Sequence, residues 1–152
     1  MRVAMVFPGQ GTQTPGMGAP WQDHPAWKLL EQAEGALDEP LRALVTNAPA
    51  EQLARTRDAQ LAVLCTSLVA WEAVRPLVDD VVAFAGHSLG QVTALVASGA
   101  LDLEDGVRFA ARREYRLACN WKEQLCFERH LAENPILADL GKQLLVSGRR
   151  ER

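Results

Sequence analysis

Residues 81–97 read VVAFAGHSLGQVTALVA, and this segment is the clearest indication of the fold class. Residues 81–85 form a short continuous apolar run, which is typical of a strand covered on both faces. The glycines in residues 86–90 predict a tight turn, and residues 91–97 continue as a helix. Ser88 is therefore expected between a buried strand and a helix, where a sharp turn would lift its hydroxyl clear of the sheet.

The rest of the chain extends this strand–turn–helix pattern into an α/β order. Val3–Phe7 is a compact apolar run that stops at Pro8-Gly9, which predicts a second buried strand running into a turn. Two strands separated by helices predict an α/β fold with parallel strands. Helices are expected at residues 27–37, after Pro40, from Pro49, at residues 58–75 and from Asp102.

Composition excludes several classes of protein. The chain has 152 residues, 48% of them hydrophobic, and a formal charge of −3, which fits one globular domain and gives no basic face for nucleic acid. The longest apolar stretch, residues 61–71, is too short to span a bilayer, and the first residues resemble no targeting peptide. The three cysteines form no CxxC pair, which favours a reducing, cytoplasmic location.

Ser88 is a candidate nucleophile because of what surrounds it. Flanking glycines allow a tight backbone, and the following helix would offer free N–H groups and a positive dipole end to an oxyanion. The G-x-S-x-G pattern also occurs by chance, so an ordinary glycine-rich loop is the alternative.

Four motifs in order resemble the malonyl-CoA:acyl carrier protein transacylases. Residues 84–100, FAGHSLGQVTALVASGA, look like the nucleophile segment of that family, and residues 6–18, VFPGQGTQTPGMG, look like its opening motif. Thr56–Gln60 resembles the Thr-x-x-x-Gln segment that begins a long helix. Asp105–Arg108 leads into Arg112-Arg113, where the family has its substrate-binding arginine. The resemblance covers residues 1–113, the expected N-terminal part of an acyltransferase catalytic domain.

The resemblance implies a fold and a reaction. The fold would be an incomplete hydrolase-like core with parallel strands and a nucleophile elbow. Ser88 would take malonyl from malonyl-CoA and pass it to acyl carrier protein through a seryl ester, in fatty acid or polyketide synthesis. The backbone N–H groups of Gln10 and Leu89 would form the oxyanion hole. No cofactor is implied beyond the coenzyme A thioester, which is substrate, and no metal.

Two further site residues follow from the resemblance. Arg113 matches the arginine that binds the malonyl carboxylate, since a guanidinium can hold a carboxylate with two parallel hydrogen bonds. Arg112 points about 100° away on a helix, so only one of the two can face the site. Arg113 is preferred because it lies five residues after Arg108, as in the family. His87 would line the site without acting as the base, because the family's base is a different histidine far downstream.

The sequence departs from the family in three ways. Gln91 replaces a usual glutamate, and Leu61 replaces a usual proline. The third departure is larger: residues 114–152 resemble nothing in the family, and the family's downstream histidine motif is missing. This tail predicts two short helices. Three of its residues are of metal-ligand type, but their spacing matches no zinc pattern: Cys119, Cys126 and His130.

Two alternatives therefore stay open. Without a general base the chain would be a truncated, catalytically inactive acyltransferase-like fragment, and a half-length core would leave sheet edges and apolar faces uncovered. A serine esterase of the α/β-hydrolase type would need His130 as its triad histidine.

Overall fold

The computed structural model describes residues 2–117, with the side chains of residues 2–112. The chain divides into two compact units, Met1–Glu114 and Tyr115–Arg152, and most of the second unit lies outside the described residues. The helices expected in the tail lie outside them as well, and the domain boundary after residue 113 stays a prediction. The three residues considered as metal ligands are also outside: Cys119, Cys126 and His130.

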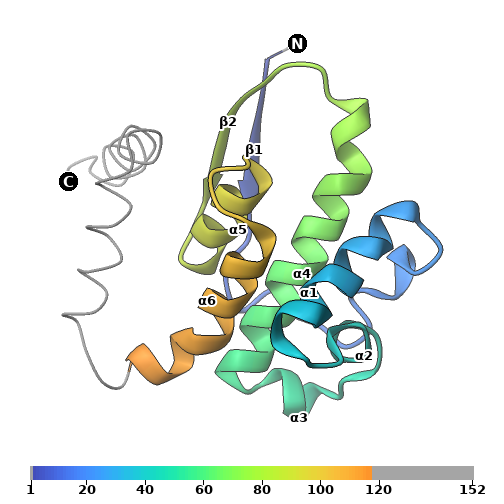
Figure 1. Ribbon diagram of the computed structural model, residues 1–152, viewed down its shortest axis with the longest axis vertical. Helices are drawn as coiled ribbons and strands as arrows, with labels where there is room; N and C mark the ends of the chain where they lie inside the picture. The colour runs from blue at the N-terminus through green and yellow to red at the C-terminus, as the bar shows by residue number, and fades with distance from the viewer. Residues whose placement is uncertain (1, 118–152) are drawn as a thin grey trace. The chain divides into compact units, whose positions relative to one another are not determined.

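Two strands form the sheet of the described part. β1 (Val3–Phe7) and β2 (Val81–Gly86) lie side by side and run parallel (Figure 1). Their register runs from Val3 opposite Val81 to Phe7 opposite Gly86, with an irregularity between Val3 and Ala4. Both predicted strands and their parallel direction are confirmed. Because parallel strands end at the same edge, the segments that leave β1 and β2 emerge next to each other.

Helices fill the long connection between the strands and follow β2. They are α1 (Lys28–Leu37), α2 (Leu41–Asn47), α3 (Ala50–Leu53), α4 (Thr56–Val74), α5 (Leu89–Ala97) and α6 (Leu103–Leu117), with 3-10 turns η1 (Ala19–Trp21), η2 (Pro25–Trp27) and η3 (Arg75–Leu77).

Two predicted helix boundaries were wrong by a few residues. α4 begins at Thr56, two residues before the predicted Asp58, because the preceding Arg55 is already extended. α5 begins at Leu89 rather than at Gln91, so the turn before it is shorter than the glycines suggested. Position 90, in the first turn of α5, requires glycine because a side chain there would collide with the backbone at the end of β1.

α4 is the central element of the core. Residues 61–66 are all buried, so the helix is covered on every side, as expected for a helix inside a domain rather than on its surface. α1, α2, α3 and α5 all contact it, and Figure 1 shows it running through the middle of the described part. Leu61 is fully buried where the resembled family has proline, and it adds apolar surface to this core. No helix described between residues 2 and 117 is long and apolar enough to cross a membrane.

The sheet is covered on one face only, which corrects the prediction of strands buried on both faces. On the covered face, Phe7 packs against Trp71 of α4 and Ala94 of α5. On the other face Val6 is 72% exposed. Val82, which the register leaves without a partner in β1, is 46% exposed. The apolar pattern of the strands is typical of a sheet covered on both faces, but no described element lies over the face that carries Val6.

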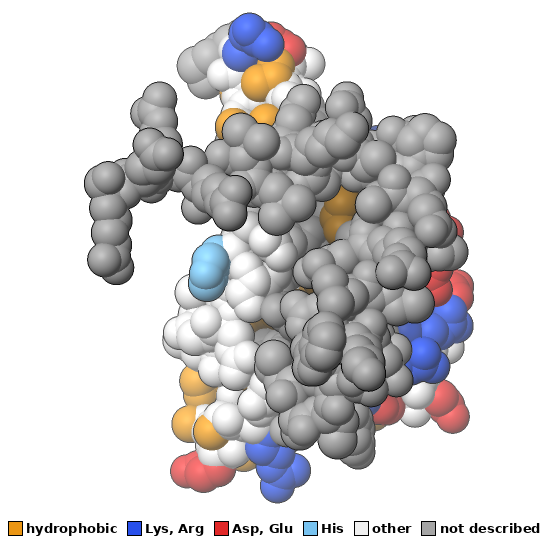
Figure 2. Space-filling view, turned by 90° about the vertical axis from the view of Figure 1, so that its left-hand side faces the viewer, with side chains coloured by type: hydrophobic (Ala, Val, Ile, Leu, Met, Phe, Trp, Pro, Cys, Tyr) orange, Lys and Arg blue, Asp and Glu red, His pale blue; other side chains and the backbone are white. Residues whose placement is uncertain are grey.

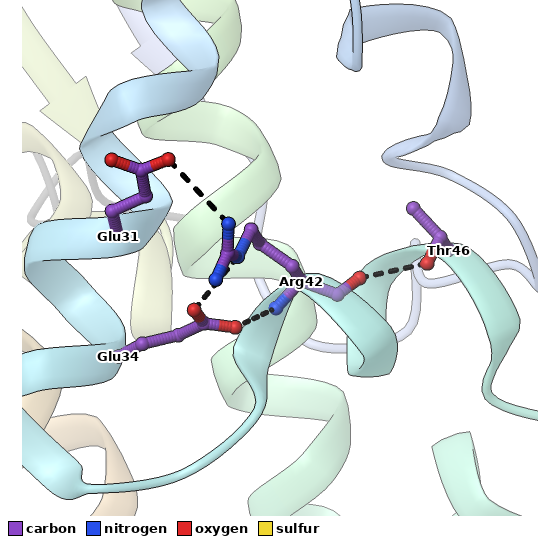
Figure 3. A network of polar contacts seen from close by, with 4 residues as sticks. All are labelled: Glu31, Glu34, Arg42 and Thr46. Carbon is purple, nitrogen blue, oxygen red and sulfur yellow. Dashed lines mark hydrogen bonds and ion pairs between the residues drawn. The ribbon is translucent and has the colours of Figure 1, made fainter.

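A carboxylate of α1 caps the start of α2 (Figure 3). The backbone N–H of Arg42 donates to Oε1 of Glu34 at 2.8 Å, and the Arg42 Nε donates to Oε2 at 2.7 Å. Arg42 is the second residue of α2, and Pro40, which precedes the helix, makes no side-chain cap. Glu31 contacts the same guanidinium more loosely, at 3.5 Å. Glu34 therefore does for α2 what an N-cap side chain normally does.

We expect Glu34→Ala to lower the free energy of unfolding by about 1–2 kcal/mol, because it removes a cap and a charge-assisted hydrogen bond. Urea unfolding followed by circular dichroism measures this. Glu31→Ala, a matched change in the same helix at a 58% exposed side chain, should change stability by less than about 0.5 kcal/mol. Equal losses in the two variants would contradict the capping role.

Cys65 is buried inside α4 with no exposed surface. Burial, and to a smaller degree the negative charge of Glu34, raises the pKa of its thiol to about 12. The thiolate is the reactive form of cysteine, so this side chain behaves as a small apolar core residue.

The raised pKa of Cys65 predicts a loss of stability at high pH. Above the ordinary thiol pKa of 9.0 the unfolded chain releases its proton while the folded chain keeps it, so stability falls from pH 9 towards pH 12. Cys65→Ala should show a shallower fall in unfolding free energy over that range. Iodoacetamide at pH 9 should alkylate Cys65 only after denaturation, as read by peptide mass mapping. Rapid alkylation of the folded chain would contradict the burial.

Candidate active site

Ser88 is the residue directly between β2 and α5. Its φ of 55° and ψ of −111° place a non-glycine residue in the half of backbone space that L-residues rarely adopt. Such a conformation costs about 1–3 kcal/mol and persists only where the surrounding structure enforces it. Among residues 2–117, the other non-glycine residue with positive φ is Asp38, which adopts the common left-handed ending of a helix. The conformation of Ser88 thus needs a local cause.

Two glycines provide that cause. A Cβ on Gly86 would lie 2.1 Å from the carbonyl carbon and oxygen of Gly90. A Cβ on Gly90 would lie 2.3 Å from the carbonyl oxygen of Phe7 and 2.9 Å from that of Pro8. Backbone atoms cannot move aside as a flexible side chain can, so both positions require glycine. The first glycine closes the turn, and the second lets α5 start against the end of β1.

The loop after β1 lies against the same turn. A Cβ on Gly9 would lie 2.7 Å from the carbonyl oxygen of His87, so these two segments touch through their backbones. The pairing of Phe7 with Gly86 leads both chains to this point. The fold therefore brings together the two motifs in which the sequence predicted Gln10 and Ser88.

Backbone N–H groups at this junction differ in whether they donate a hydrogen bond. In the first turn of α5 the second and third residues donate to carbonyls of the turn, at 2.9 and 3.2 Å. For the first residue, Leu89, no hydrogen bond of the N–H is found within residues 2–117. In the loop, Gly11 donates to the Gln13 side chain at 2.8 Å, whereas the N–H of Gln10 has no acceptor in the described part.

Gln60 joins α4 to this loop, a role that the sequence analysis missed. It is 2% exposed, and its Nε2 donates to Oε1 of Gln10 at 3.2 Å. Its own Oε1 is buried with no hydrogen-bond partner in the described part. The Thr-x-x-x-Gln motif singled out this residue, but its contact with Gln10 depends on tertiary structure, which the motif does not contain.

The histidines occupy separate positions. His87 is exposed beside the partly buried Ser88. His24 precedes η2, where its Nδ1 accepts from the N–H of Ala26 at 3.1 Å, and His130 lies outside the described residues. In Figure 2 the described surface next to the visible histidine is mostly white, and charged side chains gather at the ends and along one side of the view. No cluster of three or more potential metal ligands is present among the described side chains.

The candidate substrate arginine belongs to α6. Arg113 is a residue of that helix, but its side chain is outside the described part, so its role stays a prediction. Arg112 is exposed, and Arg108 is bound by Glu104 and Asp105 on the same helix at 3.1 and 3.6 Å. Gly106 of α6 lies against α5, since a Cβ on Gly106 would lie 2.5 Å from a Val96 methyl group.

Comparison with known proteins finds a family that matches most of the chain. The family model described as acyl transferase domain matches residues 4–123. Malonyl CoA-acyl carrier protein transacylase of Bacillus subtilis is 40% identical over 114 residues, which is 74% of this chain and 36% of the relative. The protein of the same name from Haemophilus influenzae is 40% identical over 117 residues, 74% of this chain and 37% of the relative.

Solved structures agree in the same region. An acyl-carrier-protein S-malonyltransferase from Burkholderia pseudomallei superposes with a TM-score of 0.70 at 34% identity, covering 74% of this chain and 38% of that one. A malonyl-transacylase in complex with a type II PKS acyl-carrier protein gives a TM-score of 0.67 at 36% identity, covering 72% of this chain and 37% of that one. The chain thus spans little more than a third of the length of the curated relatives it matches.

The contact between the two segments predicts unequal effects of glycine substitutions. We expect Gly90→Ala to destabilise the fold by about 2 kcal/mol or more, because its Cβ would overlap the backbone of β1. Gly35→Ala is the matched control: nothing lies within 4 Å of its Cβ, and alanine inside α1 should add about 0.5–1 kcal/mol. Thermal melts measure both, and a neutral Gly90→Ala would contradict the contact.

Proposed function

The chain belongs to the acyl transferase domain family, and on that premise we propose that it supplies the nucleophile-bearing part of a malonyl-CoA:acyl carrier protein transacylase. The observation that carries this proposal is the strained turn at Ser88, held against the end of β1 by Gly90. We interpret this turn as a nucleophile elbow within a hydrolase-like core. The product would serve fatty acid or polyketide synthesis, in the cytoplasm.

The proposed reaction has two steps. The Ser88 Oγ attacks the thioester carbonyl of malonyl-CoA and loses its proton to a base; the C–S bond breaks, and coenzyme A leaves as its thiol once protonated. The phosphopantetheine thiol of acyl carrier protein then attacks the seryl ester, which regenerates the serine hydroxyl and releases malonyl-acyl carrier protein. Splitting the transfer through an ester is nucleophilic catalysis and uses no cofactor beyond the thioester substrate.

The tetrahedral intermediate of each step carries an oxyanion that needs donors. We assign the backbone N–H groups of Leu89 and Gln10 to this task. The adjacency of the loop after β1 and the turn before α5 supports it, as does the lack of another acceptor for either N–H within residues 2–117. Gln60 would hold the loop in place through Gln10. Removing one donor from an oxyanion hole costs on the order of a hundredfold or more in rate.

Two side chains would select the acyl group and line the site. Arg113 would bind the free carboxylate that distinguishes malonyl from acetyl. His87, exposed beside Ser88, would line the entrance without acting as the base, because a neighbour on a strained turn seldom has the geometry to take the Oγ proton.

A catalytically inactive acyltransferase-like fragment is the second candidate. The observation behind it is that none of the three histidines in the given sequence lies in a motif that resembles the family's base histidine. Loss of the histidine in a serine hydrolase has cost about a millionfold in kcat. The serine esterase alternative would rest on His130, which lies outside the described residues.

Acylation by malonyl-CoA tests the proposal. We expect a malonyl adduct on the peptide that contains Ser88, detected by mass spectrometry, and none in Ser88→Ala. Ser98→Ala is the matched control at the other end of α5, where the Ser98 Oγ donates to the Leu95 carbonyl, and it should label normally. An unlabelled wild-type chain at every pH would favour the inactive fragment.

The arginine assignment has its own test. Arg113→Ala should lower malonyl labelling at least about tenfold relative to acetyl labelling from acetyl-CoA, because the carboxylate loses its partner. Arg112→Ala, the adjacent control, should leave the ratio unchanged. The reverse result would move the carboxylate site to Arg112.

A further inference from the structure

The peptide unit between Gly9 and Gln10 contains one of the two N–H groups assigned above to the oxyanion. It begins where the loop after β1 touches the turn before α5, since a Cβ on Gly9 would lie 2.7 Å from the His87 carbonyl oxygen. The peptide unit is trans and planar, so its C=O and N–H point in opposite directions and rotate together. A group that holds the Gly9 carbonyl therefore also sets the direction of the Gln10 N–H.

Thr12 holds that carbonyl. Its Oγ1 donates to the carbonyl oxygen of Gly9 at 3.1 Å, three residues back along the chain. Short hydroxyl side chains often bond to nearby backbone groups in turns in this way. A hydrogen bond accepted by the carbonyl also polarises the peptide unit and makes its N–H a stronger donor. The Thr12 hydroxyl thus acts on the Gln10 N–H from the opposite side of one peptide unit.

Other side chains anchor neighbouring parts of the same loop. Gln13 accepts from the Gly11 N–H at 2.8 Å and donates to the Leu53 carbonyl at 3.2 Å, which ties the loop to the last residue of α3. Gln60 bonds to a side chain of the loop and not to its backbone. Within residues 2–117, neither glutamine bonds to the peptide unit that contains the proposed oxyanion donor.

We propose that Thr12 is a positioning residue for the transfer reaction, because its hydroxyl directs the Gln10 N–H towards the oxyanion through the Gly9 carbonyl. Gln10 has a glycine on each side, and glycine permits many backbone conformations, so the unit can rotate unless a contact restrains it. Donors that are already aligned need no reorientation when the oxyanion forms. Thr12 is exposed in the loop and acts through the backbone. This inference rests on the proposed function, to which the oxyanion assignment belongs, but the restraint itself can be measured separately.

Rates of Ser88 acylation test the proposal. At saturating malonyl-CoA we expect Thr12→Val, which keeps the shape and loses the hydroxyl, to acylate about tenfold more slowly, less than the loss of a whole donor would cost. The half-saturating concentration should not change, because the oxyanion develops only after the substrate has bound. Thr12→Ser keeps the hydroxyl and should react within about twofold of wild type. Thr14→Val is the matched control, since the Thr14 hydroxyl makes no hydrogen bond among the described residues.

Nuclear magnetic resonance measures the restraint without any chemistry. In the isotope-labelled full chain, the Gly9 carbonyl and Gln10 amide resonances should move in Thr12→Val, return in Thr12→Ser and stay in place in Thr14→Val. These shifts decide the restraint even if malonyl-CoA does not acylate the wild-type chain, an outcome that would reject the proposed function instead. Thermal melts check that each variant is folded.

Three results would overturn the positioning role. Unchanged Gly9 and Gln10 resonances in Thr12→Val would show that the hydroxyl does not restrain the peptide unit. Acylation of Thr12→Val at the wild-type rate, or a change in its half-saturating concentration alone, would remove Thr12 from the oxyanion site. A Thr12→Ser variant as slow as Thr12→Val would assign the effect to the methyl group of threonine.

Discussion

α5 begins with its backbone against the backbone at the end of β1, and this close approach determines the geometry of the candidate site. Only a glycine at position 90 leaves room for the Phe7 carbonyl, and only a glycine at position 86 lets the chain turn back so sharply. Ser88 lies between these two glycines with a φ of 55°, a conformation that persists only where the surrounding structure enforces it. The same contacts place the loop that contains Gln10 beside the start of α5. The close approach of α5 to β1 therefore brings Ser88 and the loop that contains Gln10 together at the candidate site.

The core packs against this junction through α4. α4 is buried on all sides and touches α5 directly, so the helix that follows Ser88 rests on a rigid element. From the same α4, Gln60 reaches the loop after β1. The Oε1 of Gln60 is buried without a hydrogen-bond partner among the described residues. Site geometry and core packing are therefore parts of the same arrangement.

Much of the fold follows from local signals in the sequence. Apolar runs that stop at Pro8-Gly9 and at Gly86 located both strands, and their separation by helices indicated a parallel pair. Helix ends were less predictable: glycine at position 90 suggested a longer turn, because its steric purpose appears only when β1 is alongside. The cap that Glu34 provides for α2 and the Gln60–Gln10 hydrogen bond join residues distant in sequence, which no periodicity reports. Exposure of Val6 could not be read from an apolar pattern that encodes burial.

The pairing of β1 with β2 also determines the order in which parts of the chain fold. Everything from α1 to α4 lies within the loop that this pairing closes. Helices of this kind form through local contacts and fold early, whereas distant strands meet only after the entropy of a long loop has been overcome. During synthesis β1 emerges before β2 and has no strand partner until β2 has left the ribosome. The candidate site is therefore assembled late, and until then an apolar strand without protective charges remains exposed to other chains.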